Sequence, residues 1–357
     1  MRSALRRHIV PVLVVTAIFA TVGMLSSFAF EVPILQAALS SVILGLSVGL
    51  FEELYVQSHL GRPLRAMHPL LSAAVYTAVV LVLLLAASLV SHLLLRRTED
   101  WPQVLDRLPI ALPLAVMAAL AGILAARVIG FLGAGTLFNL ITGKYYRPLL
   151  EQKIFLFLDI KDSTATAQRI GPVKVMDLIR KFLFDVSKPL SVNGGQIYLY
   201  TGDGLIAIWN WDGVEVPRQV LRAIDQMFAT VDRESDSYRC QFATVPEFRV
   251  GVHGGPVVIA EQGDTKRAIG VYGDAINIAA RMEQIAKERE CPCVISAEVV
   301  GELARDDDRL RQLPPTVVKG IAGPIQIFEY APRRRHAGTN AGGAASTRDY
   351  RTASSRD

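Results

Sequence analysis

The chain has 357 residues, of which 51% are hydrophobic, and a formal net charge of +5. This length allows two structural units, because single domains usually contain about 100–200 residues. The apolar residues are concentrated in 9–135, and many arginines flank these apolar segments or lie in the C-terminal tail. This distribution indicates a membrane surface, and no nucleic acid, as the partner of the positive charge. Cys240, Cys291 and Cys293 are too few for a disulfide framework and lack the second ligand pair of a zinc site, so we expect reduced thiols.

The first third of the chain contains four apolar segments of about the length, ~20 residues, that a helix needs to span a bilayer. They are Ile9–Phe30, Ile34–Phe51, Leu70–Leu95 and Leu108–Leu132. The N-terminus and the loop 52–69 are basic, and short cytosolic loops carry an excess of Lys and Arg. We therefore predict a four-helix transmembrane domain over 1–132, multi-pass in the inner (plasma) membrane, with the N-terminus and the soluble part in the cytosol.

The segment 133–150 is predicted as a juxtamembrane coupling helix. Its apolar residues Leu137, Phe138, Ile141 and Tyr145 follow the spacing of one helix face, and Pro148 ends the pattern. Such a face, directly after the fourth apolar segment, is expected to pair across a dimer and couple the membrane to catalysis. A passive linker is the alternative.

Residues 151–332 have the composition of an ordinary globular domain. An apolar run predicts a strand over Lys153–Leu158, helical spacing follows from Ser163 to about Pro189, and two further strands follow. The strands Gln196–Tyr200 and Leu205–Trp209 are joined by a Thr-Gly-Asp-Gly turn, a hairpin signal. A β-α-β-β order opens an α+β, ferredoxin-like fold. The three aspartates 306–308 are interpreted as a solvated loop, and 333–357 as a disordered tail.

This topology would place Asp159, at the end of the first strand, beside Asp203, in the hairpin turn. Two converging carboxylates repel unless a hard cation lies between them, and Mg²⁺ is commonly held by one or two carboxylates plus substrate phosphates. Two such ions could activate a hydroxyl group and neutralise a leaving pyrophosphate. Taken singly, Asp159 could instead be a helix N-cap and Asp203 a turn former.

Three segments in this order resemble the catalytic domain of the class III adenylate/guanylate cyclases. They are Phe157–Thr164, the Gly-Asp-Gly of 202–204, and Gly273–Arg281. The segment Phe248–Val258 and the closing Lys319-Gly320 with Ile325–Tyr330 are also similar to the family pattern. The resemblance covers about 151–332 and implies the class III cyclase fold for this domain.

The resemblance also implies roles for individual residues. Asp159 and Asp203, with the carbonyl of Ile160, would bind two Mg²⁺ or Mn²⁺ ions per site. Asn277 would orient the ribose, and Arg281, four residues further along one helix, would stabilise charge in the transition state. Because the family's sites form between two catalytic domains and this chain has one, a homodimer with two equivalent sites is implied. The implied substrate contacts are Ser163, Thr164, Gly202 and Lys319.

The base of the substrate is left open by these motifs. The positions at which relatives read adenine are Leu199 and Gly270, and neither side chain can form a hydrogen bond. From the frequency of activities in the family, the expected function is a membrane-bound adenylate cyclase that converts ATP to 3′,5′-cyclic AMP and pyrophosphate. The alternatives are a guanylate cyclase and a catalytically silent, cyclase-like membrane receptor or scaffold.

Overall fold

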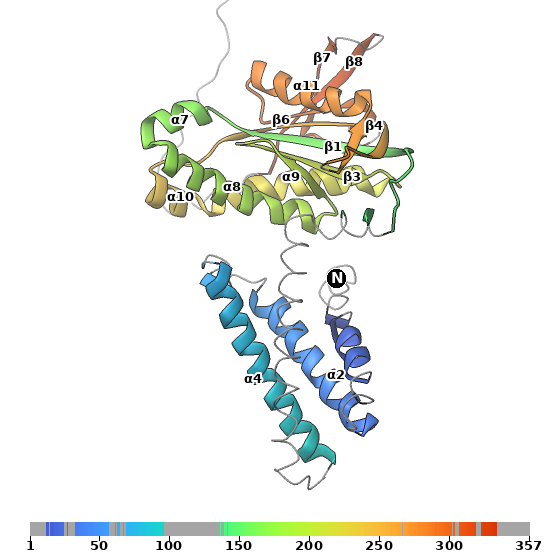
Figure 1. Cartoon of the computed structure of the whole chain (residues 1–357). Coiled ribbons are helices and arrows are strands. Elements are labelled where there is room, and N and C mark those ends of the chain that lie inside the picture. The colour runs from blue at the N-terminus through green and yellow to red at the C-terminus, as the bar shows by residue number, and fades with distance from the viewer. Residues whose placement is uncertain are drawn as a thin grey trace, which may run out of the picture. The chain divides into compact units, whose positions relative to one another are not determined.

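The computed structural model describes residues 12–13, 15–24, 27, 33–56, 61, 63–64, 67, 69–95, 136, 139–140, 142–265, 267–301, 303, 307–318 and 323–333. The chain divides into two compact units, Met1–Ile141 and Thr142–Asp357. The described part of the first unit is helical, whereas the second contains a mixed sheet with helices on both faces (Figure 1).

The N-terminal unit contains α2 (Ile34–Phe51), which continues into the π-helix η1 (Glu52–Val56), and α4 (Pro69–Leu95). Within its described residues, two stretches are long and apolar enough to cross a membrane, Ile34–Val56 and Ala74–Leu95. The predicted four-helix domain is therefore not confirmed. The first predicted segment is described only in part, as a shorter apolar helix over Val15–Met24, and Leu108–Leu132 lies outside the described residues.

Helices α2 and α4 pack through a small apolar core. Leu44 and Val48 of α2 are buried with Val80 and Ala87 of α4. The hydroxyl groups of Ser40 and Ser91 lie 2.8 Å apart and so form a hydrogen bond between the two helices. The outward surface is also apolar, as Leu35 with 68% and Leu93 with 69% exposure illustrate. The hydrophobic side chains of this unit thus face both its core and its surroundings.

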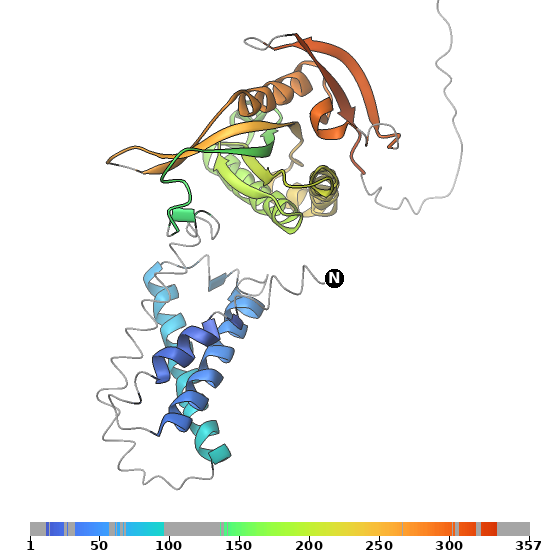
Figure 2. The same ribbon diagram turned by 90° about the vertical axis from the view of Figure 1, so that its right-hand side faces the viewer.

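The second unit is built on one eight-stranded sheet of order β2-β3-β1-β4-β6-β8-β7, with β5 paired to β4. Only the β4–β6 pair is parallel. In Figure 2 the hairpin formed by β4 and β5 projects beyond the body of the sheet. The strands are β1 (Leu149–Ile160), β2 (Gln196–Tyr200), β3 (Leu205–Asn210), β4 (Phe248–Gln262), β5 (Ala268–Tyr272), β6 (Cys293–Ser296), β7 (Leu310–Val317) and β8 (Pro324–Tyr330).

Helices cover both faces of this sheet, with α8 and α9 on one face and α11 on the other (Figure 1). The alternation of side chains along β1 explains why both faces are apolar: Ile154 and Leu156 lie in the core with α8 and α9, whereas Phe155 lies in the core with α11. The helices are α7 (Ser163–Ile170), α8 (Pro172–Val192), α9 (Glu215–Arg233), α10 (Ser235–Phe242), α11 (Asp274–Glu288) and α12 (Ala297–Val300).

The predicted β-α-β-β order is observed, with one correction to its helix. The helical region from Ser163 consists of two helices, because Gly171 adopts a φ of +88° that ends α7 and precedes α8. Helix α8 then continues past Pro189 to Val192, where the Asn-Gly-Gly of 193–195 ends it. The first strand is also longer than predicted and begins at Leu149, because its first residues pair with β4.

The coupling helix predicted over 133–150 does not extend to its predicted end. Residues 142–147 form turns and bends, and β1 begins at Leu149. Tyr145 is buried, its carbonyl accepts a 2.8 Å hydrogen bond from the backbone N–H of Glu261, and its hydroxyl donates to Glu151 at 3.2 Å. These contacts replace the hydrogen bonds that a continuing helix would make. The apolar positions Leu137, Phe138 and Ile141 lie outside the described residues.

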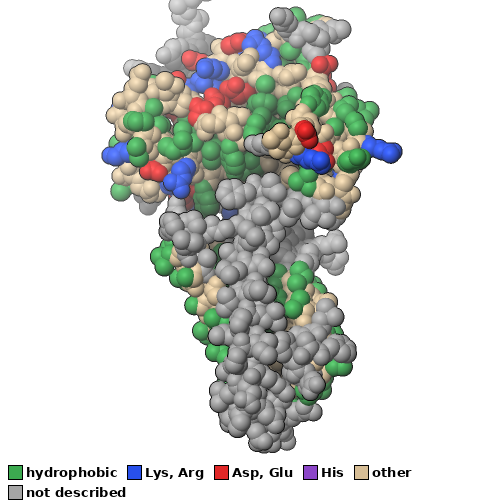
Figure 3. Space-filling view, in the orientation of Figure 1, with side chains coloured by type: hydrophobic (Ala, Val, Ile, Leu, Met, Phe, Trp, Pro, Cys, Tyr) green, Lys and Arg blue, Asp and Glu red, His purple; other side chains and the backbone are tan. Residues whose placement is uncertain are grey.

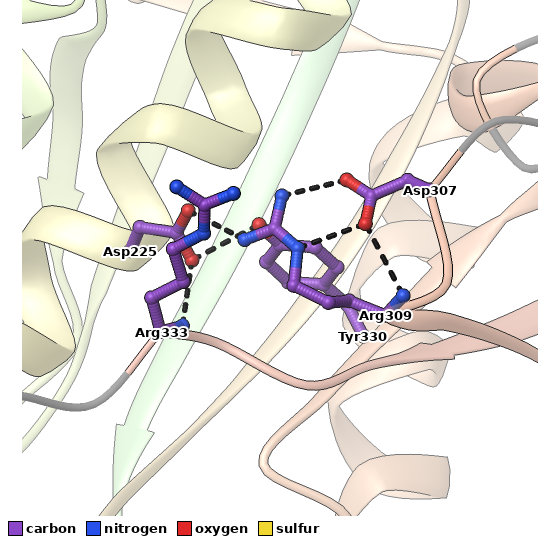
Figure 4. Close-up of polar contacts among 5 residues, drawn as sticks. All are labelled: Asp225, Asp307, Arg309, Tyr330 and Arg333. Carbon is purple, nitrogen blue, oxygen red and sulfur yellow. Dashed lines mark hydrogen bonds and ion pairs between the residues drawn. The ribbon is translucent and has the colours of Figure 1, made fainter.

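The three aspartates interpreted as a solvated loop differ from one another: Asp308 is exposed as expected, Asp306 lies outside the described residues, and the side chain of Asp307 is paired and only partly exposed. Its carboxylate accepts hydrogen bonds from Nε of Arg309 at 2.8 Å and from Nη2 at 2.6 Å. Arg309 also donates to Asp225 of α9 at 2.8 Å and lies over the ring of Tyr330 (Figure 4). Asp225 accepts further hydrogen bonds from the Tyr330 hydroxyl and from the backbone N–H of Arg333. This network ties the C-terminal strands to α9.

Candidate active site

Asp159 and Asp203 come together at one edge of the sheet. Asp159 is the second-to-last residue of β1, and Leu158 pairs with Leu205, the first residue of β3. The turn that carries Asp203 therefore lies beside the end of β1. Gly202 makes this tight turn possible, because its φ of +87° is strained for any residue with a Cβ. The hydroxyl of Ser163 donates a hydrogen bond to Oδ2 of Asp203.

The surroundings of Asp159 disfavour its ionised form. Burial, the charge of Asp203 and the charge of Glu283 raise the pKa of Asp159 to about 6. Lys287 opposes this rise only weakly. Burial and negative neighbours destabilise the ionised form of a carboxyl group, and a bound cation stabilises that form. Nor is Asp159 a helix N-cap, since that position of α7 belongs to Asp162.

Glu283 and Arg249 were not predicted from the sequence. Arg249 is 8% exposed and occupies the position of β4 opposite Asp159. Glu283 of α11 comes close because a Cβ at Gly251 of β4 would lie 2.0 Å from the Glu283 backbone nitrogen, so only glycine permits this approach. One carboxylate oxygen of Glu283 is buried with no hydrogen-bond partner in the structure. The sequence signal that could have indicated Glu283 is an acidic residue two positions after Arg281.

The donor set at this edge fits a hard divalent cation. Asp159 and Asp203 offer carboxylate oxygens and Ile160 a backbone carbonyl, and oxygen donors suit Mg²⁺ or Mn²⁺. Among the described residues, no three His, Cys, Asp or Glu side chains surround one point as a metal cage. Glu283 is thus a charged neighbour of the pair, and water and substrate oxygens would complete the coordination of an ion held by the two aspartates.

Asn277 and Arg281 lie on α11, four residues apart, and do not contact the Asp pair of their own chain. Asn277 is exposed. The guanidinium of Arg281 instead donates to Gln284 at 3.0 Å and to Glu288 at 2.8 Å, both on the same helix. Thr164 is exposed in the first turn of α7. The last of the expected substrate contacts, Lys319, lies outside the described residues.

A cavity of about 390 Å³ lies between α7, α8 and the segment before β4. Ser163 and Thr166 line it, together with Lys161 and Arg169, and Val175 contributes to its apolar wall. Neither Asp159 nor Asp203 is among its lining residues. The half-buried Asp pair therefore lies outside this cavity.

Residues 149–330 match the family model of the adenylate and guanylate cyclase catalytic domain. The match covers the whole sheet, from the first residue of β1 to the last of β8. The chain belongs to the adenylate and guanylate cyclase family. The predicted resemblance is confirmed, and the second unit is the cyclase domain of a nucleotide cyclase.

Relatives of this cyclase include adenylate cyclases of bacteria. Adenylate cyclase 2 of Rhizobium meliloti (strain 1021) is 30% identical over 256 residues, which are 71% of this chain and 69% of the relative. The adenylate cyclase of Anabaena cylindrica is 30% identical over 181 residues, which are 49% of this chain but only 36% of that protein. The solved structure of a bacterial light-regulated adenylyl cyclase covers 61% of this chain and 64% of its own, with a TM-score of 0.53 and 19% identity, and so shows the shared fold.

Cyclase domains of this family use divalent metal ions, bind nucleotide substrates and act as dimers. The use of divalent metal ions agrees with the oxygen donors of Asp159 and Asp203.

Proposed function

We propose that this cyclase is an adenylate cyclase that converts ATP to 3′,5′-cyclic AMP and pyrophosphate. The ribose 3′-oxygen forms a bond to the α-phosphorus, the bond from that phosphorus to the oxygen bridging to the β-phosphate breaks, and the 3′-hydroxyl proton passes to water. The convergence of Asp159 and Asp203 at the end of β1 carries this proposal. Relatives named adenylate cyclase support ATP as the substrate.

The residues of the site divide into metal-binding and nucleotide-binding groups. Asp159, Asp203 and the carbonyl of Ile160 would hold two Mg²⁺ or Mn²⁺ ions. When bound, such ions lower the pKa of the attacking hydroxyl and neutralise the leaving pyrophosphate. Ser163 and Thr164 begin α7, whose first turn offers free backbone N–H groups to phosphate. Gly202 lies next to Asp203, and Lys319 is a further proposed phosphate contact.

We place each active site between two copies of the chain. Asn277 and Arg281 are proposed to bind the ribose and the reacting phosphate of the nucleotide held by the partner's Asp pair. The contact of Arg281 with Glu288 on its own helix supports this arrangement, because no hydrogen bond among the described residues directs the guanidinium to Asp159. Dimerisation of the family supports it as well. The homodimer would then have two equivalent sites.

The N-terminal unit is proposed to anchor the enzyme in the inner membrane, with the cyclase domain and the N-terminus cytosolic. Two of its described helices are long and apolar enough to span a bilayer. Side chains such as Leu35 and Leu93 are more than half exposed, and most of the described side chains of this unit that face the viewer in Figure 3 are hydrophobic. Such a surface is stable in lipid and unfavourable in water.

The test is nucleotide turnover by the full-length protein in membranes, with Mn²⁺ or Mg²⁺ and with ATP and GTP in parallel assays. Formation of cyclic AMP well above that of an Asp159→Asn, Asp203→Asn control is the expected result. Cyclic GMP as the main product would replace adenylate with guanylate cyclase. No cyclic nucleotide from either substrate would overturn the proposed function and leave a silent receptor or scaffold.

Complementation tests the shared site. An Asp203→Ala chain and an Arg281→Ala chain are each expected to be inactive as homodimers. Their heterodimer contains one site in which neither substitution occurs, so co-expression should restore up to about half of the activity per dimer. Verified heterodimers without activity would show that each domain works with its own residues.

Guanylate cyclase is the second candidate function, because the positions that read the base in the family do not discriminate against guanine. The residues at the two base-reading positions of the family, Leu199 and Gly270, offer no hydrogen bond, and the Leu199 side chain is half-exposed. Nothing at these two positions selects adenine over guanine.

A further inference from the structure

The space beside Gly270, in the middle of β5, is filled by a neighbouring side chain. A Cβ at this position would lie 2.7 Å from Cδ, 2.9 Å from Nε2 and 2.9 Å from Oε1 of Gln262. The amide group of Gln262 therefore occupies the space that a side chain at 270 would fill. Gly270 is buried for this reason, although β5 belongs to a projecting hairpin.

The register of the hairpin explains the contact. Ala260 of β4 pairs with Gly270, and Gln262 pairs with Ala268, so Gln262 and Gly270 are diagonal neighbours on the two strands. From the other side, the hydroxyl of Tyr272 donates a hydrogen bond to Oε1 of Gln262. The hydrogen bond from Tyr272 thus holds the amide over Gly270.

The aromatic side chain of Tyr272 contacts this amide and is 55% exposed. Tyr198, from β2, donates to the carbonyl of Ile269 at 3.2 Å and packs with Ile269 and Val271 against the core under α11, so it supports the strand that carries Gly270. An exposed aromatic ring with an amide beside it is a combination that recognises a nucleobase, by stacking on the ring and hydrogen bonding to its edge.

The position also matches the other nucleotide contacts. Strand β5 ends at Tyr272 and α11 begins at Asp274, so the element that carries Asn277 and Arg281 follows β5 directly. A nucleotide whose ribose and phosphate contact α11 would have its base near β5. Within the hairpin, Gln262 is the amide side chain that lies against Gly270.

We propose that Gln262 reads the base of the substrate, in place of a side chain at position 270. This inference rests on the proposed function. The adenine 6-amino group would donate to Oε1, and Nε2 would donate to the adjacent ring nitrogen, a two-bond contact that Gln makes well with adenine. An amide both donates and accepts hydrogen bonds, so it can pair with the amino group and the ring nitrogen of adenine at once. A charged side chain only donates or only accepts. Tyr272 is a positioning residue that orients the amide.

The experiment compares wild-type, Gln262→Glu and Gln262→Ala full-length protein in membranes. The ratio of kcat/KM for ATP to that for GTP is measured for each. A carboxylate only accepts hydrogen bonds, and guanine presents two donor groups on one edge where adenine presents one amino group, so Gln262→Glu should lower the ratio at least tenfold. The matched control is Gln241→Glu on α10, an exposed glutamine outside the hairpin, which should leave the ratio unchanged.

A second pair of variants tests the contact itself. Gly270→Ala places a Cβ against the amide and should lower the ATP preference in the wild-type background, but have little effect in the Gln262→Ala background. Equal effects in both backgrounds, or an unchanged ATP/GTP ratio in Gln262→Glu and Gln262→Ala, would overturn the proposal.

Binding separates this proposal from the proposed function. Competition of ATP and GTP against a fluorescent, non-cyclisable ATP analogue gives the base preference without turnover. If the wild-type protein forms no cyclic nucleotide, the cyclase proposal fails, yet a selective loss of ATP binding in Gln262→Glu would still support base reading by Gln262. If turnover is normal and the ratio of binding constants is unchanged in Gln262→Glu, only the assignment of Gln262 fails.

Discussion

The two ends of strand β1 carry charged clusters of opposite character. At its start, Glu151 lies 2.8 Å from Lys144 and 2.6 Å from Lys153, and Lys153 also donates to Asn210. At its end, Asp159 faces other carboxylates. In the cluster at the start, two ammonium groups neutralise one carboxylate, whereas the cluster at the end has an excess of negative charge.

The pKa values of the carboxyl groups reflect this difference. Burial alone would raise the pKa of Glu151, but its bonds with Lys144 and Lys153 hold it at about 2. Burial and two negative neighbours raise the pKa of Asp159 to about 6. A protein gains stability from the first arrangement and loses stability through the second unless a cation binds there. The comparison therefore separates a structural cluster from a functional one on a single strand.

The largest expected effect is on catalysis, from the end of β1. Asp203→Asn keeps the shape of the turn and removes one metal-binding charge, so cyclase activity should fall at least about 100-fold, the loss of several kcal/mol of transition-state stabilisation. The metal-free protein should be as stable as wild type or more so. Asp212→Asn, an exposed aspartate after β3, is the control. Near-wild-type activity of Asp203→Asn in a membrane assay would contradict the functional role of this end.

The second-largest expected effect is on stability, and it comes from the charged cluster at the start of β1. Glu151→Gln leaves Lys153, which is 4% exposed, without its counter-ion, so the free energy of local unfolding should fall by about 2–3 kcal/mol. Amide hydrogen exchange of β1 in the full-length protein measures this change, and activity per folded molecule should stay within about twofold. Glu215→Gln, which breaks an exposed pair with Arg218, should cost less than about 1 kcal/mol. Equal costs in the two variants would remove the distinction between a buried and a surface pair.

A smaller effect is expected from Glu283, which adds negative charge beside the Asp pair without serving as a metal ligand. Glu283→Gln should weaken Mn²⁺ binding by roughly fivefold, since one charge at this range contributes about 1 kcal/mol. Titration of Mn²⁺ by electron paramagnetic resonance gives the affinity without substrate. Tighter binding in the variant would show that Glu283 competes for the ion or for Arg249 and does not assist the pair.

The pH dependence of stability should also differ between the two ends. The raised pKa of Asp159 means that its stabilising contribution is present below about pH 4 and lost as the pH rises through 6. The lowered pKa of Glu151 gives a contribution that is present above about pH 4.5 and lost as the pH falls towards 2.

Hydrogen exchange in EDTA, with wild type and Asp159→Asn compared from pH 4 to 7, tests the first of these contributions. The stability of Asp159→Asn relative to wild type should increase up to about pH 6.5 and then level off. A difference that is independent of pH would contradict the charge repulsion at this end. With saturating Mn²⁺ in place of EDTA, the wild type should become the more stable of the two proteins, because it binds the ion and the variant does not.

The end cluster could be predicted from sequence because its signals are local. The apolar run before Asp159 and the Gly-Asp-Gly turn around Asp203 each define an element on their own, and antiparallel pairing brings the two together. The start cluster was not predicted, because it depends on the turn over residues 142–147 that brings Lys144 to Glu151 and on the pairing of Lys153 with Asn210 of β3.

Long-range register also explains the other omissions. Gln262 reaches Gly270 through the β4–β5 pairing, and Glu283 reaches the Asp pair because α11 packs against Gly251. Asp307 is paired in the structure because Arg309 bridges it to Asp225, 84 residues before Arg309 along the chain. Such contacts leave no periodic pattern in the local sequence, so they could not be predicted from it. Leu199 and Gly270 could be singled out only as departures from the family pattern.

Tyr145 fixes the point at which the chain enters the cyclase domain. Its carbonyl accepts a hydrogen bond from the N–H of Glu261 and its hydroxyl donates one to Glu151. These two contacts restrain the chain between Thr142 and β1. A torque or tensile load arriving from upstream would therefore be transmitted to β4 at Glu261, one residue before Gln262. Mechanical input and the proposed base contact would then act on neighbouring residues of one hairpin.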